Sequence, residues 1–471
     1  MPLEQMLIGL LAFGVVVFAT ATAGHALLYK RDTRAVIAWV GLIILVPLAG
    51  ATMYWILGVN RVRRRAVALR PRGAVPSHGL ASSIVRPPRG FEPLARVGDK
   101  VGPFALSSGN LIEPLENGDE AFPPMLEAIS AARHSIALTT YIFDNDDVGR
   151  QFADALVDAH ARGVAVRVII DAVGQRYSWP SMLRRLRAAG VPAAAYMPII
   201  MNRNLAALNL RNHRKLLAVD GQTAFTGGMN IRGGNVLAKP SRHPVRDLQF
   251  RVRGPVVQDL MSVFVSDWEF VAGESLSGAH WFPPLDECGP IVARAIPDGP
   301  DEYFEVLRMI IMGALAQARE SVLIATPYFL PDAGLISALN TAALRGVSVD
   351  LLLPEKNNLK LVQWASFALY WQVLDRGCRI WHSPPPFDHS KLMLVDDQWA
   401  LVGSTNWDPR SMRLNFELNL ECYGTELCAE MRAWFERRRE LAREISQADM
   451  DNRHLSRRLR DGVARLLSPY L

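Results

Sequence analysis

Two stretches of this 471-residue chain decide its fold: NHRKLLAVDGQTAFTGGMN at residues 212–230 and DHSKLMLVDDQWALVGSTN at residues 388–406. They align without a gap, and matched residues are 176 positions apart. In each stretch an HxK triplet begins an apolar run, and a turn and a second apolar run lead to a glycine and an asparagine. We expect each stretch to form a β-hairpin that brings its polar residues to one end. These residues are His213, Lys215 and Asn230 in the first stretch and His389, Lys391 and Asn406 in the second.

The sequence around the hairpins repeats as well. SIALTTYIF at 135–143 is similar to SVLIATPYF at 321–329, and ARGVAVRVIID at 161–171 is similar to LRGVSVDLLLP at 344–354. Helical patterns alternate with these short buried runs, which is typical of a mainly parallel sheet covered by helices on both faces. We therefore predict two copies of one α/β unit, at residues 119–275 and 301–471, joined by a proline-rich connector at 276–300. Tyr141 and Tyr328 lie near matching strand ends, where we favour core packing over a place at a ligand crevice.

The residue types in the hairpins suit phosphodiester exchange. A neutral imidazole is a competent nucleophile that forms a phosphohistidine, and a second imidazole can protonate the departing alkoxide. The two lysines and the two asparagine amides would stabilise phosphoryl oxygens, a task often given to a metal ion. We expect no metal site and no cofactor, and the four cysteines show no metal-ligand spacing.

Each histidine also needs a carboxylate to set its tautomer and to stabilise the imidazolium. Asp247 lies 34 residues after His213, and Glu417 lies 28 residues after His389, both in alternating, strand-like segments. We predict these two carboxylates as the orienting pair. Within the motif itself, a site role and a role in closing the hairpin turn are equally compatible with Asp220 and Asp396.

The motif HxKxxxxD followed by GGxN or GSxN, occurring twice, resembles the phospholipase D superfamily over about residues 119–445. Segments such as VGSTNWDPRS and NFELNLE, the terminal RLLSPYL and the amino-terminal PLAGATMYWILG resemble bacterial cardiolipin synthases of the membrane-anchored type. The resemblance implies an α/β fold with two α/β/α sandwich units related by a pseudo-two-fold axis, and one active site at their interface.

The resemblance also assigns roles to residues. It implies His213 as nucleophile and His389 as general acid and base, which symmetry alone leaves open. It implies phosphate binding by Ser404, whereas Gly228 takes the matching position in the first copy. The catalytic set is then His213, Lys215, Asp220, His389, Lys391 and Asp396, with Asn230, Asn406 and Ser404 binding phosphate and Asp247 and Glu417 orienting the histidines.

The first sixty residues are apolar enough for a membrane segment. Residues 5–29 and 35–60 contain no Asp, Glu, Lys or Arg, and these stretches of 25 and 26 residues are each about long enough to cross a bilayer as a helix. We predict a transmembrane helical hairpin at residues 1–60. Pro47 and Gly50 leave a re-entrant second segment as the alternative, and the lack of Lys and Arg in residues 1–5 argues against a cleaved signal peptide.

The formal net charge of +6 equals the contribution of six arginines that follow the apolar region, Arg61, Arg63, Arg64, Arg65, Arg70 and Arg72. Residues 61–118 are predicted to form a basic juxtamembrane segment and a linker rich in Pro and Gly. The positive-inside rule then places the catalytic domains in the cytoplasm, with a multi-pass anchor in the bacterial inner membrane. The remainder of the chain is net neutral, which argues against a nucleic-acid partner. The juxtamembrane arginines would attract anionic membrane lipids, and the resemblance implies phosphatidylglycerol as the substrate lipid. A homo-oligomer remains open.

The resemblance implies cardiolipin synthesis, in which a phosphatidyl group passes from one phosphatidylglycerol to another through a phosphohistidine and glycerol is released. The alternative is a phospholipase D-type hydrolase or headgroup-exchange enzyme acting on another phospholipid, because the chemistry is the same up to the acceptor. A nuclease is disfavoured by the membrane segment and the neutral remainder. A non-catalytic membrane scaffold is disfavoured because His, Lys and Asn are intact in both copies.

Overall fold

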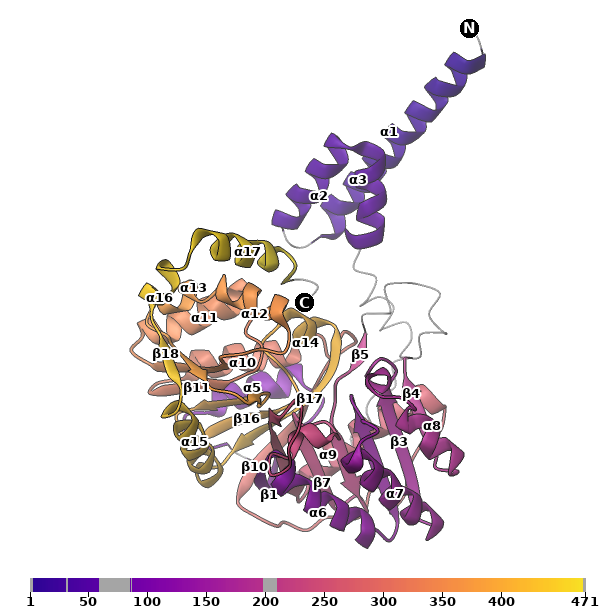
Figure 1. Ribbon diagram of the computed structural model, residues 1–471, viewed down its shortest axis with the longest axis vertical. Helices are drawn as coiled ribbons and strands as arrows, with labels where there is room; N and C mark the ends of the chain where they lie inside the picture. Colours follow the sequence, from indigo (N-terminus) through magenta and orange to yellow (C-terminus); the bar gives the residue numbers. More distant parts are fainter. Residues whose placement is uncertain (1–2, 31–32, 59–84, 86, 198–209, 469–471) are drawn as a thin grey trace. The chain divides into compact units, whose positions relative to one another are not determined.

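The computed structural model describes residues 3–30, 33–58, 85, 87–197 and 210–468. Its internal contacts divide the chain into two compact units, residues 1–68 and residues 69–471. Figure 1 draws both units, coloured along the chain. The six arginines between residues 61 and 72 lie outside the described residues.

The first unit contains one helix of membrane-spanning length. Among the described residues, α1 (Leu3–Tyr29) is the one helix long and apolar enough to cross a bilayer. The second predicted span is broken at Pro47 into α2 (Thr33–Leu45) and α3 (Pro47–Met53), followed by a π-helical turn, η1 (Tyr54–Gly58). The expectation of a second continuous span is therefore wrong for these residues. Proline lacks the N–H that a continuous helix needs at this position and clashes with the preceding turn.

The shorter helices pack against each other and against α1. Gly50 of α3 lies so close to α2 that a Cβ there would be 2.6 Å from a carbonyl oxygen of α2. The Tyr54 hydroxyl and His25 Nδ1 are 2.8 Å apart, and Trp55 Nε1 donates to Thr22 Oγ1 at 2.9 Å. These polar pairs attach η1 to the carboxyl-terminal third of α1.

One sixteen-stranded sheet runs through both copies of the second unit. The first copy contributes β1 (Ser107–Glu116), β2 (Ser135–Thr140), β3 (Ala165–Asp171), β4 (Ala193–Tyr196), β6 (Leu216–Val219), β7 (Thr223–Gly227) and β9 (Leu248–Arg253). The second contributes β10 (Ile291–Asp298), β11 (Ser321–Ala325), β12 (Ser348–Pro354), β13 (Arg379–Ser383), β15 (Leu392–Val395), β16 (Trp399–Gly403), β17 (Asn415–Tyr423) and the edge strand β18 (Arg443–Ile445).

The strand order shows the internal symmetry. Along the main path it is β18-β13-β12-β11-β15-β16-β17-β10-β1-β9-β7-β6-β2-β3-β4, and the sixteenth strand, β5 (Arg211–Asn212), pairs with β17 off this path. Counted outward from the β10–β1 pair, the two copies match over seven strands each, to β13 and β4, and the edge strand β18 has no counterpart among the described strands. The pseudo-two-fold axis therefore passes between β10 and β1. The predicted α/β fold with two related units is thus observed as one continuous sheet.

Along the main path of the sheet, parallel pairing is confined to the outer strands of each copy. β2, β3 and β4 are parallel neighbours, and so are β11, β12 and β13. The hairpin strands β6 and β7 pair antiparallel with each other and with β2 and β9, and the second copy repeats this pattern. The sheet is therefore mixed rather than mainly parallel, because each HxK hairpin reverses the chain within the sheet.

Helices cover both faces of the sheet (Figure 1). In the first copy, α6 (Asn117–Ala131), α7 (Asp147–Ala161) and α8 (Met182–Ala188) share a hydrophobic core with β2 and β3. α9 (Val256–Ala272) packs across β4, β6 and β9. In the second copy α10 (Val306–Gln317), α11 (Ala333–Leu344) and α15 (Thr425–Arg439) match α6, α7 and α9 in chain order. α7 and α11 begin alike, because the side chains of Asp146 and Asp332 accept backbone N–H bonds of the first turn.

The remaining described elements are short helices and strands, mostly in the second copy. They are η2 (Gly174–Tyr177), β5 (Arg211–Asn212), η5 (Gly233–Asn235), β8 (Val245–Arg246), α12 (Lys360–Phe367), α13 (Trp371–Leu374), β14 (Phe387–Asp388), α14 (Pro409–Arg413), α16 (Gln447–Asp451) and α17 (Leu455–Leu466).

Segments predicted as linkers belong to the fold. α5 (Glu92–Val101) and β1 lie inside the predicted 61–118 linker, and β10 lies inside the predicted 276–300 connector. The buried Arg294 of β10 bonds Glu421 of β17 at 2.5 Å and Asp99 of α5 at 2.7 Å, which ties all three elements together. The copies therefore begin at β1 and β10 rather than at residues 119 and 301. Proline and glycine hid these strands from the sequence pattern, as at Pro114, which pairs opposite Phe250.

Candidate active site

The two hairpins bring the predicted polar residues to one end, as expected. Lys215 directly precedes β6 and Asn230 follows β7, and these strands pair antiparallel. Lys391 and Asn406 hold the same positions around β15 and β16. His213 and His389 lie three residues before the first strand of their hairpins, directly after the short strands β5 and β14.

Asp220 and Asp396 lie at the opposite, closed end of the hairpins. Both have a left-handed backbone, with φ of 52° and 51°, a conformation that aspartate tolerates well in tight turns. The carboxylate of Asp220 accepts backbone N–H bonds from residues 133–135, and that of Asp396 from residues 319–321. Five residue steps along a strand separate each aspartate from its lysine, roughly 16 Å. The structure therefore removes both from the predicted catalytic set and supports the turn interpretation.

Each histidine is connected to the other copy by one short parallel pairing of strands. β5, which precedes His213, pairs with the start of β17, and β14, which precedes His389, pairs with β8. The pairings continue in the backbone: His213 N donates to the carbonyl of Phe416 at 2.9 Å, and His389 N donates to that of Arg246 at 2.8 Å. The residues that follow these two acceptors are Glu417 and Asp247.

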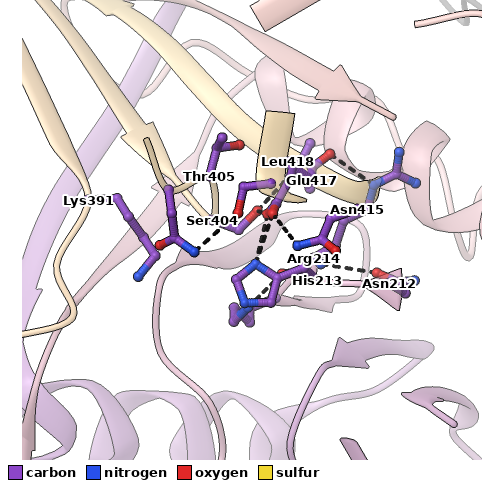
Figure 2. A network of polar contacts seen from close by, with 12 residues as sticks. Asn212, His213, Arg214, Lys391, Ser404, Thr405, Asn415, Glu417 and Leu418 are labelled. Carbon is purple, nitrogen blue, oxygen red and sulfur yellow. Dashed lines mark hydrogen bonds and ion pairs between the residues drawn. The ribbon is translucent and has the colours of Figure 1, made fainter. Parts of the chain in front are cut away.

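The orienting carboxylates are consequently exchanged between the copies. His213 Nδ1 lies 2.9 Å from Glu417 Oε2 and 3.0 Å from its Oε1, and Figure 2 shows the carboxylate beside the imidazole. His389 Nδ1 lies 2.7 Å from Asp247 Oδ2. The structure thus places both predicted carboxylates at the histidines, and each one bonds to the histidine of the opposite copy. Counting positions within each copy did not predict this exchange.

Glu417 is fully buried and held by three neighbours, with Ser404 and Asn415 visible around it in Figure 2. The Ser404 hydroxyl donates to Glu417 Oε2 at 2.5 Å and Asn415 Nδ2 donates to Oε1 at 3.1 Å. Arg214 Nε donates to the Glu417 carbonyl at 3.0 Å. Ser404 is fully buried behind the carboxylate, so the structure makes it a positioning residue for Glu417 and not the predicted phosphate ligand.

Gly228, the counterpart of Ser404, leaves room for the shorter carboxylate of the first copy. A Cβ at Gly228 would be 2.3 Å from Asp247 Oδ1, closer than side chains approach each other. Asp247 Oδ1 instead accepts from Leu248 N at 2.9 Å. Asp247 therefore needs a glycine at position 228, whereas Ser404 fits beside Glu417 and bonds to its carboxylate. Gly228 is thus explained by its carboxylate neighbour and does not mark a lost phosphate ligand.

Both histidines line one cavity of about 230 Å³. Because each Nδ1 is engaged, Nε2 is the ring nitrogen left for a ligand. Asn230 Oδ1 accepts from Ile142 N at 3.0 Å, which leaves its NH₂ group free to donate, and Asn406 uses one amide hydrogen on Ser411 at 3.1 Å. The cavity wall also carries arginines and aromatic rings, namely Arg211, Arg232, Arg410, Tyr141, Tyr177, Tyr328 and Phe387.

The two lysines stand behind the histidines and are buried. Lys215 Nζ donates to the His213 carbonyl at 2.6 Å. Lys391 Nζ bonds the His389 carbonyl and lies 2.9 Å from His389 Nδ1. Burial lowers the pKa of Lys215 to about 7 and that of Lys391 to about 8, against the opposing effect of the carboxylates. An anion in the cavity would favour their protonated forms.

The two histidine–carboxylate pairs differ electrostatically. Burial lowers the pKa of His213, against the charge of Glu417. Burial acts to raise the pKa of Glu417, but the His213 imidazole and Lys215 outweigh it and the pKa is lowered. Glu417 is therefore ionised at neutral pH and accepts Nδ1–H from a neutral His213, whose Nε2 then holds a lone pair.

At the second pair, burial together with the charges of Lys391 and Lys215 lowers the pKa of His389 well below its ordinary value. Burial raises the pKa of Asp247 to about 6, against the charge of Lys391. Asp247 thus titrates close to neutral pH, whereas Glu417 stays ionised there. The two pseudo-symmetric histidine–carboxylate pairs therefore differ in protonation state.

Sequence reasoning missed several residues that build the site. Arg214, inside the HxK triplet, forms two bonds of 2.7 Å to the buried Asp267 of α9. The ring of Tyr141 packs edge-on against His213, with 5.3 Å between centroids, and that of Tyr328 packs edge-on against His389 at 6.1 Å. Both tyrosines line the cavity, so the preference for core packing is wrong. Their places near corresponding strand ends, one position out of step, were the available signal.

The fold and the site define a phospholipase D-like protein, with two related α/β units and paired HxK hairpins around one cavity. Among solved structures, phosphatidylserine synthase from Haemophilus influenzae Rd KW20 matches with a TM-score of 0.61, at 15% identity, over 80% of this chain and 100% of that chain. At this identity the likeness shows a shared fold.

Sequence comparisons give the family. The family described as cardiolipin synthase, PLD-like domain, matches residues 125–268 and 311–439, one segment in each copy. Cardiolipin synthase 2 of Bacillus cereus is 33% identical over 456 residues, covering 94% of this chain and 88% of that protein. The major cardiolipin synthase of Bacillus subtilis is 29% identical over 456 residues, covering 94% and 95%. The chain belongs to the cardiolipin synthase family of phosphatidyltransferases, which confirms the predicted family.

Substitutions at Asp396 and Glu417 test whether Asp396 stabilises the hairpin turn and Glu417 supports catalysis. Asp396→Asn removes one acceptor from a turn and should lower the free energy of unfolding by about 1–2 kcal/mol while leaving kcat within about twofold at 20 °C. Glu417→Gln keeps the size but removes the charge that fixes the His213 tautomer, and kcat should fall about 1,000-fold or more. Thermal unfolding and turnover of the full-length protein check both. An equal loss of kcat in Asp396→Asn would contradict the turn assignment.

Proposed function

We propose that the protein synthesises cardiolipin by moving a phosphatidyl group from one phosphatidylglycerol to another, with release of glycerol. The observation that carries the proposal is that two imidazoles line one cavity, each with Nδ1 engaged by a carboxylate and Nε2 left for a ligand. One phosphorus between them would meet a nucleophile on one side and a proton donor on the other. Membership of the cardiolipin synthase family gives the substrate class.

In the first half-reaction, His213 Nε2 attacks the phosphorus of the donor lipid. The N–P bond forms as the bond from phosphorus to the glycerol oxygen breaks, and the glycerol alkoxide takes a proton from His389. In the second, a hydroxyl of the acceptor phosphatidylglycerol gives its proton to His389 and attacks phosphorus, and the N–P bond breaks. His213 is restored, and all atoms balance.

The different surroundings of the two Nδ1 atoms support these roles. Nδ1 of His213 contacts the ionised Glu417, which places the lone pair on Nε2. Nδ1 of His389 lies 2.7 Å from Asp247 Oδ2 and 2.9 Å from Lys391 Nζ, and its proton faces the carboxylate, so Nε2 is the nitrogen that gives and takes the catalytic proton. When His389 takes up a second proton, Asp247 at 2.7 Å stabilises the imidazolium.

Charge on the phosphoryl oxygens would be stabilised by protein groups. The amides of Asn230 and Asn406 are the proposed hydrogen-bond donors, and the Lys215 and Lys391 ammonium groups act from behind the histidines. No step of the proposed reaction passes through a metal ion.

Arginines in the cavity support an anionic lipid as acceptor. Arg211 and Arg410 line the same cavity as the histidines, and a second phosphatidylglycerol brings a second phosphate diester that such residues bind well. The alternative, hydrolysis or headgroup exchange on another phospholipid, uses the same first half-reaction and differs in the acceptor.

Product analysis distinguishes these functions. Full-length protein is reconstituted in phosphatidylglycerol vesicles with chelator, and cardiolipin, glycerol and phosphatidic acid are quantified. We expect equimolar cardiolipin and glycerol, and losses of at least about 1,000-fold in His213→Ala and His389→Ala. Phosphatidic acid as the main product would establish a hydrolase instead, and full dependence on a divalent ion would contradict the mechanism.

A donor lipid whose headgroup is p-nitrophenol tests the two histidine roles. Its phenolate leaves without protonation, so His389→Ala should release about one equivalent of nitrophenolate and accumulate phosphatidyl-enzyme on His213. His213→Ala should release none, because it lacks the nucleophile. The reverse pattern would assign nucleophile and acid the other way round. Stopped-flow absorbance and mass spectrometry of the acid-quenched protein give the readouts.

We also propose how the protein sits in the bacterial inner membrane. In this arrangement α1 crosses once and the broken α2–α3 segment is re-entrant, rather than the protein being multi-pass. Two observations support it: α1 alone among the described helices has spanning length, and both segments flanking α2–α3 are basic in sequence. One crossing leaves both basic segments, and the catalytic unit, on the cytoplasmic side, in keeping with the positive-inside rule.

Cysteine labelling tests this topology. In a Cys288→Ser background, Gln5→Cys should react with a membrane-impermeant maleimide in intact spheroplasts. Thr33→Cys should react only after permeabilisation, as should the control Leu441→Cys in the catalytic unit. Labelling of Thr33→Cys in intact cells would favour a helical hairpin that crosses twice.

A further inference from the structure

The carboxyl-terminal helix α17 exposes a continuous apolar stripe. Leu455, Leu459, Val463 and Leu466 are 66%, 62%, 63% and 76% exposed. Their spacing of four, four and three residues places all of them on one face of the helix. Single exposed leucines are common on protein surfaces, but a helix-long row of them is unfavourable in water and marks an interaction surface.

The opposite face of α17 is anchored to the protein. Asp461 is 2% exposed and forms ion pairs with Arg453 at 2.7 Å and Arg460 at 2.8 Å. Both arginines also reach α12, where Arg453 lies 4.2 Å from the centre of the Phe367 ring and Arg460 lies 4.4 Å from that of Trp364. α17 therefore cannot turn its apolar face inward without breaking these contacts, and Figure 1 shows it on the outside of the catalytic unit.

Basic side chains border the stripe. Arg458 and Arg465 lie along one side of it and are exposed, and in the described part of the chain neither of them forms an ion pair. α17 contains four arginines against one acidic residue, the buried Asp461. An apolar face bordered by arginines matches the charge and polarity of an anionic lipid surface.

The helix beneath α17 leads directly to the active-site cavity. Leu359, at the start of α12, and Val362 within it both line the cavity that holds the two histidines. Leu359 and Leu361 are 49% and 45% exposed, so apolar surface continues from α12 at the edge of the cavity. Because α17 packs on α12, a surface that binds α17 also fixes the position of α12 and of this edge of the cavity.

We propose that α17 is an interfacial helix that lies in the headgroup layer of an anionic bilayer, with its apolar stripe at the acyl boundary, and thereby keeps the cavity edge formed by α12 at the lipid surface. The occupant of the stripe is the membrane itself, not a second protein. The docking extends the proposed function, since a lipid donor and acceptor must enter the cavity from a bilayer, but it does not depend on which reaction follows.

Nitroxide depth measurement tests the docking. In full-length Cys288→Ser protein, Leu459→Cys is spin-labelled and reconstituted in vesicles of phosphatidylglycerol and phosphatidylcholine. The matched control is Leu441→Cys, which replaces an exposed leucine of similar exposure, 69%, that is not part of the stripe. We expect the label at 459 to be accessible to oxygen and protected from a water-soluble nickel chelate, at a depth of about 5–10 Å, and the label at 441 to be accessible to the chelate.

Two outcomes would overturn the proposal. Equal exposure of both labels to the chelate would show that α17 stays in water. Protection at 459 that persists in detergent micelles and depends on protein concentration would show a protein partner. The same measurement in the His213→Ala protein gives depth in the absence of turnover, so failure of the docking and failure of the proposed reaction remain distinguishable.

Turnover on two forms of substrate provides the second test. Leu459→Glu/Val463→Glu should lower turnover of bilayer phosphatidylglycerol about fivefold or more, with turnover of dispersed short-chain phosphatidylglycerol unchanged. The control Leu344→Glu/Leu441→Glu changes two exposed leucines elsewhere and should affect neither assay. Equal losses on both substrates in the stripe variant, or no loss on either, would contradict the proposal.

Discussion

The site depends on the exchange of carboxylates between the two copies: Glu417 of the second copy binds His213 of the first, and Asp247 of the first binds His389 of the second. Both carboxylates are almost fully buried, and a buried charge without its partner costs several kcal/mol. Separating the copies would leave two such charges at once. Neither copy therefore contains a complete site, and the continuous sheet through β1 and β10 is what keeps the two halves in register.

Much of the site could be predicted from the sequence, because two gapless HxK hairpins fix where His, Lys and Asn lie at one end of a sheet. The residues Asp247 and Glu417 could also be found, from their strand-like surroundings. Their partners could not. Both carboxylates follow at similar distances in both copies, so pairing within a copy and pairing between copies leave the same sequence pattern. The strands that decide it, β5 and β14, are two residues long, too short for any periodicity to reveal.

The wrong predictions share a physical cause. A polar residue type shows that a side chain will form hydrogen bonds, but it does not show which group is the partner. The Ser404 hydroxyl bonds Glu417, and the Asp220 carboxylate closes a turn against backbone N–H groups. Composition misled in a similar way at β1 and β10, where proline and glycine suggested linkers although these strands form the centre of the sheet. At Pro47 composition was informative, because the chain does break there and the second predicted span becomes two short helices.

The central claim is that both imidazoles act on a single phosphorus, and an experimental structure of the full-length protein with orthovanadate tests it most directly. Vanadate adopts the five-coordinate geometry of a phosphoryl group in transfer. The account predicts one vanadium bonded to Nε2 of His213, with the opposite apical oxygen in hydrogen-bond contact with Nε2 of His389. Vanadate held by one histidine, with the other ring beyond contact of any vanadate oxygen, would contradict it.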